Sequence, residues 1–159
     1  MAKSLLDDRE VIPLFHLPAR DGRLFDSSEF KRRKNLVIFF LSRPEKEFFV
    51  AVEEAYALMK EQNAEAIVIS PVSGDTLEEI HQRNRLTYWI LSDGKREVFS
   101  KFIQASPGEG VAALFITDKF GEVFFQYVAP AIKDLPPFDD IVKSLNFIES
   151  QCPECLGGL

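Results

Sequence analysis

Apolar and polar residues along the chain fall into blocks that predict strands and helices in turn. Residues 36–41 and 66–69 are apolar throughout, and such unbroken runs are typical of central strands covered on both faces. Between them, apolar residues recur at helical spacing, which predicts a helix from about residue 44 to residue 62. The predicted buried face of this helix consists of Phe48, Phe49, Val52, Tyr56 and Met59.

The start of this helix carries local signals of its own. Ser42 and Glu45 have the spacing of a capping box, and Pro44 fits the first helical turn. The alternation of elements then continues along the chain. It predicts a helix over residues 75–85, a short strand over 88–91 and a helix over 96–103.

The pattern changes after residue 112. Residues 113–117 and 123–128 flank a glycine-containing turn at 118–121, which predicts an antiparallel hairpin. Strict alternation in the second strand would put Phe124, Gln126 and Val128 on one face and Val123, Phe125 and Tyr127 on the other. Both faces are largely apolar, which favours their burial by an added helix or by a partner chain in a homo-oligomer or complex.

A last amphipathic helix is predicted after Pro136-Pro137, with Phe138, Ile141, Val142, Leu145 and Ile148 on its apolar face. Together these elements predict one α/β domain over residues 1–150. Its central mixed sheet would combine parallel strands with the C-terminal antiparallel hairpin, and helices would cover both faces. Residues 151–159 would form a C-terminal tail.

Charge narrows the classes of partner. The 159-residue chain has a net charge of −6, which disfavours nucleic-acid binding because that function needs a basic face. The dense basic run Lys31-Arg32-Arg33-Lys34 lies between two apolar segments and is predicted to be a solvated loop.

The sequence shows neither a membrane-spanning apolar run nor a signal peptide, and this indicates the cellular compartment to expect. No apolar run approaches the roughly 20 residues that span a bilayer. The charged N-terminus lacks the apolar stretch of a signal peptide. A cytoplasmic location is therefore expected. The two cysteines are too few for a secreted disulfide scaffold.

Four short segments carry a family resemblance. They are Leu14-Phe15-His16-Leu17 with Asp21-Gly22-Arg23 and Ser27-Ser28-Glu29-Phe30, then 35–41, then Leu91-Ser92-Asp93, and finally 115–123. In this order and spacing they resemble the redoxin group, the peroxiredoxin (AhpC/TSA) and TlpA-like branch of the thioredoxin fold. The resemblance covers about residues 11–150. It implies a thioredoxin-like fold, antioxidant or oxidoreductase chemistry, and a nucleophilic cysteine at the start of the helix after strand 35–41.

The chain departs from this family at the residues that would do the chemistry. A thioredoxin-type alignment puts Pro44 and Glu47 at the two cysteine positions, and a peroxiredoxin-type alignment puts Phe48 or Phe49 at the peroxidatic position. Ala112 stands where the family places a cis-proline or an arginine. None of these residues is a thiolate nucleophile, so we expect a degenerate site, as in a pseudoenzyme.

All the cysteine of the chain lies in one CxxC segment, Cys152-Pro153-Glu154-Cys155. As a redox dithiol, the pair would make the chain a thiol–disulfide oxidoreductase or relay. As a zinc half-site, Cys152 and Cys155 would supply two of four thiolate ligands, with the others coming from a second copy or another protein. In that alternative the domain is a non-catalytic scaffold whose tail binds metal or docks a partner. The third reading is an inert tail.

Other polar residues give weaker signals. His16 and His81 have no Asp or Ser at a diagnostic spacing and are predicted to be structural or solvated. Asp93 and Asp118 lie in glycine-containing turns, where aspartate is favoured because it bonds the backbone. The segment 106–110 lacks the lysine and spacing of a phosphate-binding loop.

Overall fold

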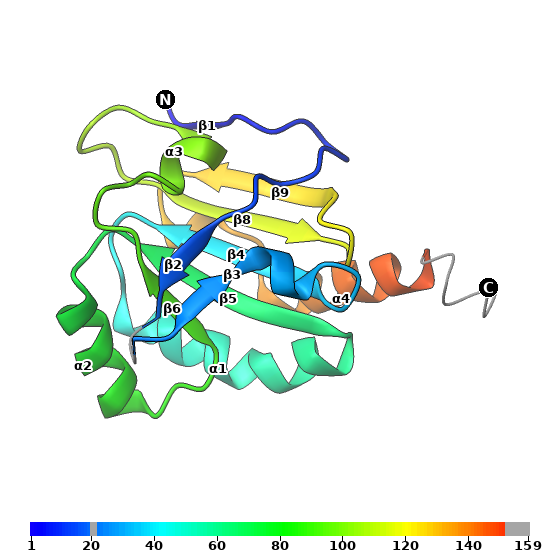
Figure 1. The fold of residues 1–159 in the computed structure, drawn as a ribbon, viewed down its shortest axis with the longest axis horizontal. Coiled ribbons are helices and arrows are strands. Elements are labelled where there is room, and N and C mark those ends of the chain that lie inside the picture. Colours follow the sequence, from blue (N-terminus) through cyan, green and yellow to red (C-terminus); the bar gives the residue numbers. More distant parts are fainter. Residues whose placement is uncertain (20–21, 152–159) are drawn as a thin grey trace.

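The computed structural model describes residues 1–19 and 22–151, and their centre is a five-stranded mixed sheet (Figure 1). Its strands lie in the order β6-β5-β4-β8-β9. They are β4 (Asn35–Leu41), β5 (Ala64–Ser70), β6 (Trp89–Ser92), β8 (Ala112–Thr117) and β9 (Val123–Ala129). Strands β4, β5 and β6 run parallel, whereas β8 is antiparallel to β4 and β9 is antiparallel to β8. The predicted sheet of parallel strands with a C-terminal hairpin is confirmed.

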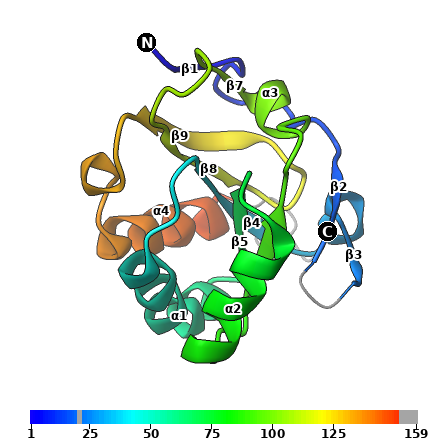
Figure 2. The same cartoon turned by 90° about the vertical axis from the view of Figure 1, so that its left-hand side faces the viewer.

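Three helices cover one face of the sheet (Figure 2). They are α1 (Lys46–Glu61), α2 (Gly74–Asn84) and α4 (Phe138–Ser150). The other face is covered by shorter elements: the hairpin of β2 (His16–Pro18) and β3 (Leu24–Asp26), the 3₁₀ helix η1 (Ser27–Phe30), and α3 (Phe99–Phe102). The strands β1 (Lys3–Ser4) and β7 (Ile103–Gln104) pair with each other, and η2 (Ile132–Asp134) precedes α4.

Strand β4 divides the core because its side chains alternate between the two faces. Val37, Phe39 and Leu41 pack toward α1 and α4, whereas Leu36, Ile38 and Phe40 pack toward α3 and the β2–β3 hairpin. All seven residues of β4 are buried. Covering on both faces explains why its sequence is apolar throughout rather than alternating.

The predicted capping box at the start of α1 is wrong. Helix α1 begins at Lys46, and its N-cap residue, Glu45, makes no side-chain capping bond. The hydroxyl of Ser42 bonds instead to the backbone of Val111, which is 69 residues away in the sequence. Because β8 lies antiparallel beside β4, this tertiary partner is available, and a local spacing argument does not include it.

The helix predicted over residues 96–103 is shorter than expected, since α3 covers only Phe99–Phe102. At its start, the backbone of Arg96 has a φ of 56° and makes a turn rather than a helical step. At its end, Ile103 and Gln104 pair with β1. Both ends are therefore set by competing backbone interactions.

The strict alternation predicted for β9 is also wrong at one point. The β8–β9 ladder contains an irregularity between Ile116 and Thr117, so that Val123 pairs with Thr117 and Phe125 with Ile116. The extra residue, Phe124, packs on the same side as Phe125, toward α4. Val123 packs on the opposite side. A β-bulge of this kind shifts the face on which each side chain lies.

Candidate functional site

The family resemblance would place a redox centre at the junction of β4 and α1. Leu41, the last residue of β4, lies opposite Ala112 at the start of β8. The loop that follows contains Pro44, which is half-buried, and Glu47 is exposed in the first turn of α1. The structure therefore brings the predicted positions Pro44, Glu47 and Ala112 to one end of the sheet, which we call the Pro44 end.

The loop at the Pro44 end is fixed by hydrogen bonds between Ser42 and Val111. The Ser42 amide donates to the Val111 carbonyl oxygen at 3.0 Å, and the Ser42 hydroxyl donates to the same oxygen at 3.1 Å. The Val111 amide donates to the Ser42 hydroxyl at 2.8 Å. The polar groups that border this site thus bond one another.

Phe48 and Phe49 are packed into the core at this end. The ring of Phe48 lies edge-on to Phe39, with centroids 5.0 Å apart, and 5.8 Å from the ring of Phe138. Phe49 is completely buried, and its carbonyl oxygen accepts a hydrogen bond from the Tyr88 hydroxyl at 2.8 Å. Burial raises the pKa of Tyr88, as does the nearby charge of Glu53, so this hydroxyl keeps its proton to donate.

The chemistry available at the Pro44 end is therefore limited. Ala112 is buried and supplies a methyl group where a polar partner would stand. Pro44, Phe48 and Phe49 supply no titratable group. Glu47, though acidic, is an exposed first-turn residue that suits the positive end of the helix dipole. A thiolate nucleophile has no counterpart among the five predicted site residues.

Cys152 and Cys155 lie outside the described residues, but their point of attachment is fixed. Gln151, the last described residue, ends α4. Phe138, at the start of α4, contacts Phe48, and thirteen residues of helix at 1.5 Å each separate it from Gln151 by about 20 Å. Gln151, from which the pair continues, therefore lies at the end of α4 away from Phe48.

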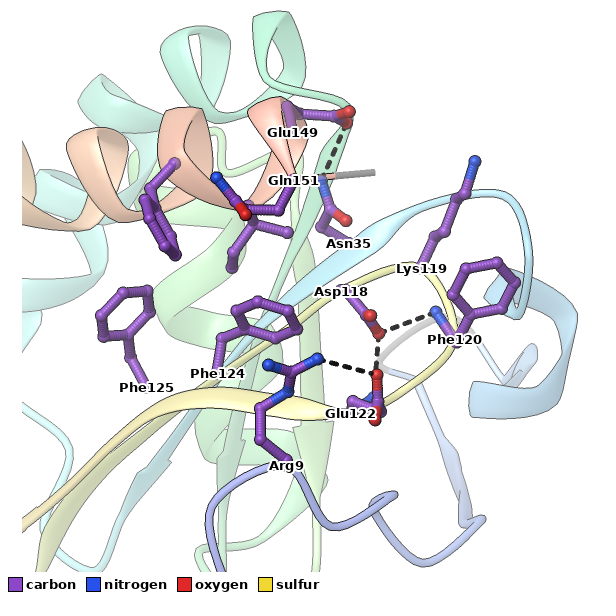
Figure 3. Close-up of a pocket in the computed structure, with 12 residues that line it drawn as sticks. Arg9, Asn35, Asp118, Lys119, Phe120, Glu122, Phe124, Phe125, Glu149 and Gln151 are labelled. Atoms are coloured by element: carbon purple, nitrogen blue, oxygen red, sulfur yellow. Dashed lines mark hydrogen bonds and ion pairs between the residues drawn. The ribbon is translucent and has the colours of Figure 1, made fainter. Parts of the chain in front are cut away.

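The other end of the sheet, which we call the Gln151 end, carries a groove with a volume of about 660 Å³ (Figure 3). The groove runs between α4 and the start of β9. Its apolar part consists of Phe120, Phe124, Phe125, Phe147 and Ile148, and its polar part includes Arg9, Asn35, Asp118, Glu122, Glu149 and Gln151. Sequence reasoning missed this groove because the bulge in β9 that turns both Phe124 and Phe125 toward α4 has no clear local sequence pattern.

Hydrogen bonds and charges hold the polar side of the groove in place. Asn35 donates to the Glu149 carboxylate at 3.0 Å, which connects the start of β4 to the end of α4. The guanidinium of Arg9 lies 3.4 Å from the Glu122 carboxylate and 4.0 Å from the centre of the Phe124 ring. Figure 3 shows Asp118 and Glu122 turned toward one another at the β8–β9 turn.

Asp118 and Asp93 bond the backbone of their turns, as predicted. One Asp118 oxygen accepts from the amides of Phe120 at 2.9 Å and Glu122 at 3.0 Å. Partial burial, followed by the charge of Glu122, raises the pKa of Asp118 despite these bonds. The buried Asp93 accepts from the Phe99 amide at 2.7 Å at the start of α3. Both aspartates have structural partners.

Within residues 1–19 and 22–151, no group of three or more His, Cys, Asp or Glu side chains could hold a metal ion. In the same described ranges, no helix is long and apolar enough to cross a membrane. His16 is exposed on β2, and His81 lies in α2, where its carbonyl accepts the capping bond from Arg85.

Solved structures similar to this chain include peroxiredoxins. Peroxidoxin BcpB from Mycobacterium tuberculosis matches with a TM-score of 0.75 and 18% identity, over 91% of this chain and 97% of that one. A reduced 2-Cys peroxiredoxin from Plasmodium vivax matches with a TM-score of 0.75 and 17% identity, over 90% and 96%. Mycobacterium tuberculosis AhpC matches with a TM-score of 0.71 and 17% identity, over 94% and 98%. At these identities the likeness shows the fold.

Comparison of sequences gives the family. A search of curated proteins found no significant match. The family model of AhpC/TSA matches residues 9–126, which include β4, α1 and Ala112 and make up well over half of the chain. The thioredoxin-like redoxin fold predicted from the sequence is thereby confirmed. The chain belongs to the AhpC/TSA family.

Proposed function

We propose that this chain is a thiol–disulfide relay of the AhpC/TSA family that acts through Cys152 and Cys155 instead of a cysteine at the first turn of α1. The observation that carries the proposal is the burial of Phe48 and Phe49 where a nucleophile would stand. The same end of the sheet offers Ala112 in place of a polar partner. The chain's two cysteines are then the remaining candidates for thiol chemistry.

The proposed reaction is an exchange between the Cys152–Cys155 dithiol and a partner disulfide. A thiolate of the pair attacks a partner disulfide, forms a mixed disulfide and releases one partner sulfur as a thiolate. The second cysteine loses its proton to solvent and attacks the mixed disulfide, which releases the other partner sulfur. The partner disulfide is reduced by two electrons, and Cys152 and Cys155 are oxidised to one disulfide. A dithiol reductant then returns the pair to its reduced form.

Insulin reduction in the presence of dithiothreitol tests this proposal. The wild-type chain is expected to accelerate reduction above the rate with dithiothreitol alone, and Cys152→Ser or Cys155→Ser should remove the acceleration. Phe48→Leu is the matched control, because it changes the Pro44 end and keeps both thiols. The proposal fails if the wild type gives no acceleration, or if both serine variants retain it.

A second candidate function is a non-catalytic scaffold whose cysteine pair forms half of a zinc site. Two exposed aromatic residues favour it, since Tyr127 on β9 is 39% exposed and Phe147 on α4 is 49% exposed. Exposed aromatic side chains are enriched at protein interfaces. Elemental analysis for zinc together with native mass spectrometry tests it. One zinc ion per dimer, lost in Cys152→Ser, would support the scaffold, whereas a metal-free monomer would count against it.

A further inference from the structure

Five basic side chains gather at the Gln151 end of the domain. Lys31, Arg32 and Arg33 are exposed and Lys34 is half-buried in the loop between η1 and β4. Lys119 in the β8–β9 turn belongs to the same cluster, because the amide of Arg32 donates to the Lys119 carbonyl oxygen. The cluster contrasts with a chain whose net charge is −6. A local field of this sign attracts an anionic partner and speeds its encounter.

The loop that carries the cluster has a fixed backbone. The amides of Arg33 and Lys34 both donate to the Phe30 carbonyl oxygen at 2.9 Å. Arg32 has a φ of 68°, in the left-handed region that residues other than glycine seldom adopt. Its bond to Lys119 holds this conformation. A surface that is already ordered loses less conformational entropy when it binds.

Exposed apolar side chains occupy the centre of this basic surface. Val11 is 48% exposed and Leu14 is 58% exposed, and both line a shallow hollow together with Lys31, Lys34 and Lys119. Val11 is held in place because the neighbouring Ile12 amide donates to Gly121 at 2.9 Å. An apolar centre with a charged rim is the usual anatomy of a protein–protein interface.

Two acidic residues near this surface, Asp118 and Glu122, bond to groups other than its lysines. Glu122 pairs with Arg9 at 3.4 Å, on the groove side of the β8–β9 turn. Asp118 accepts hydrogen bonds from the amides of Phe120 and Glu122. Among the lysines of the hollow, Lys31 is exposed and carries its charge into solvent.

The basic surface lies next to the point from which the cysteine pair extends. Asp118, Lys119 and Phe120 line both the shallow hollow and the groove at Gln151 (Figure 3). Cys152 directly follows Gln151 in the chain. A partner seated on the hollow would thus have its disulfide within reach of the pair.

We propose that this surface docks an acidic segment of the protein whose disulfide exchanges with Cys152 and Cys155, an inference that rests on the proposed function. The acidic segment pairs with the basic run Lys31-Arg32-Arg33-Lys34, and one of its apolar side chains covers Val11 and Leu14. A protein fits better than a nucleic acid, because the remainder of the chain is acidic and the centre of the surface is aliphatic.

The test uses two peptide disulfides that share one reactive cysteine and one leucine and differ in carrying four glutamates or four glutamines. The wild-type chain is expected to reduce the acidic peptide about tenfold faster at low salt. This preference should fade toward 1 M salt, where charges are screened within about 3 Å. Arg32→Glu with Arg33→Glu should remove the preference and leave the rate with the glutamine peptide unchanged. Lys101→Glu with Lys133→Glu makes the same change of charge at exposed sites outside this surface, and should retain the preference.

The docking inference and the proposed thiol–disulfide exchange are overturned by different results of this test. Equal rates with both peptides for the wild type, or an equal loss of preference in both double variants, would overturn the docking inference. Exchange with neither peptide would count against the proposed function. The docking inference would then be decided by fluorescence anisotropy, which measures binding of the acidic peptide with serine in place of its cysteine. Binding by wild type that Arg32→Glu with Arg33→Glu abolishes would support it. Tighter binding of a single-stranded oligonucleotide or of anionic vesicles than of the acidic peptide would overturn it.

Discussion

The hydroxyl of Ser42 bonds both backbone groups of Val111, since it accepts from the amide at 2.8 Å and donates to the carbonyl oxygen at 3.1 Å. This pair joins the end of β4 to the start of β8 at the place where AhpC/TSA proteins would begin their chemistry. The serine acts there as a structural link between two strands, and the loop that follows it is anchored before α1 begins.

Replacing Ser42 by alanine is expected to destabilise the fold. The substitution leaves the Val111 amide without its acceptor, and an unsatisfied buried donor costs about 1–3 kcal/mol. Urea unfolding followed by circular dichroism measures the change in the free energy of unfolding. Ser100→Ala is the control, because the exposed Ser100 hydroxyl bonds only the Arg96 carbonyl nearby in sequence. Equal effects of the two substitutions would contradict the structural role of Ser42.

Phe49, one of the positions at which the family resemblance would place a nucleophile, is expected to contribute to the core. Phe49→Ala should lower the free energy of unfolding by about 3–5 kcal/mol, because it removes a fully buried ring and leaves a cavity. Leu58→Ala on the same helix should change it by roughly 0.5 kcal/mol or less, because Leu58 is 48% exposed. Chemical denaturation of both variants makes the comparison, and a tolerated Phe49→Ala would argue for an open site at this position.

Two tyrosines predict a loss of stability at alkaline pH. Burial raises the pKa of Tyr88 and of Tyr56, and the hydrogen bond from Tyr56 to Glu65 adds to the second effect. In the unfolded chain both hydroxyls ionise near pH 10, so above that pH the folded state binds more protons. Its free energy of unfolding should then fall by up to about 2.7 kcal/mol per pH unit.

Unfolding by urea between pH 9 and pH 11 measures this slope. The double variant Tyr56→Phe with Tyr88→Phe is expected to show a flatter dependence, because neither position then has a proton to lose. A slope that the double variant leaves unchanged would show that other groups determine the alkaline limit.

The opposite pKa shifts of Asp118 and Asp26 predict opposite changes in stability when each carboxylate is replaced by an amide. Partial burial raises the pKa of Asp118, so its ionised form costs stability at neutral pH. Asp118→Asn keeps an acceptor for the turn amides and should raise the free energy of unfolding at pH 7. This gain should vanish as the pH falls below about 4, where the unfolded carboxyl is protonated as well.

The matched control is Asp26→Asn. Hydrogen bonds from the hydroxyl and amide of Ser28 lower the pKa of Asp26, so its charged form stabilises the fold at pH values above that of the unfolded carboxyl. Asp26→Asn should therefore lower the thermal unfolding temperature at pH 7, and the difference should shrink as the pH falls. Shifts of the same sign for both variants would contradict the assigned causes.

Local sequence was sufficient for the elements whose environment is uniform along their length. The strands β4 and β5 were predicted because a strand covered on both faces needs apolar residues at every position. The long helices α1 and α4 were predicted because one buried stripe repeats at helical spacing. The degenerate site at Pro44, Glu47, Phe48, Phe49 and Ala112 stays a prediction, which rests on the family resemblance at those positions.

Only the tertiary structure decided features that depend on partners far apart in the chain. It joined Ser42 to Val111, and it turned Phe124 toward α4 through a bulge in β9. It also placed Gln151 beside Asn35 and Asp118, at the opposite end of the sheet from Pro44. Residue identity and spacing determine which local structures are favourable. The packing of β8 against β4 and of α4 against the sheet determines which distant side chains meet.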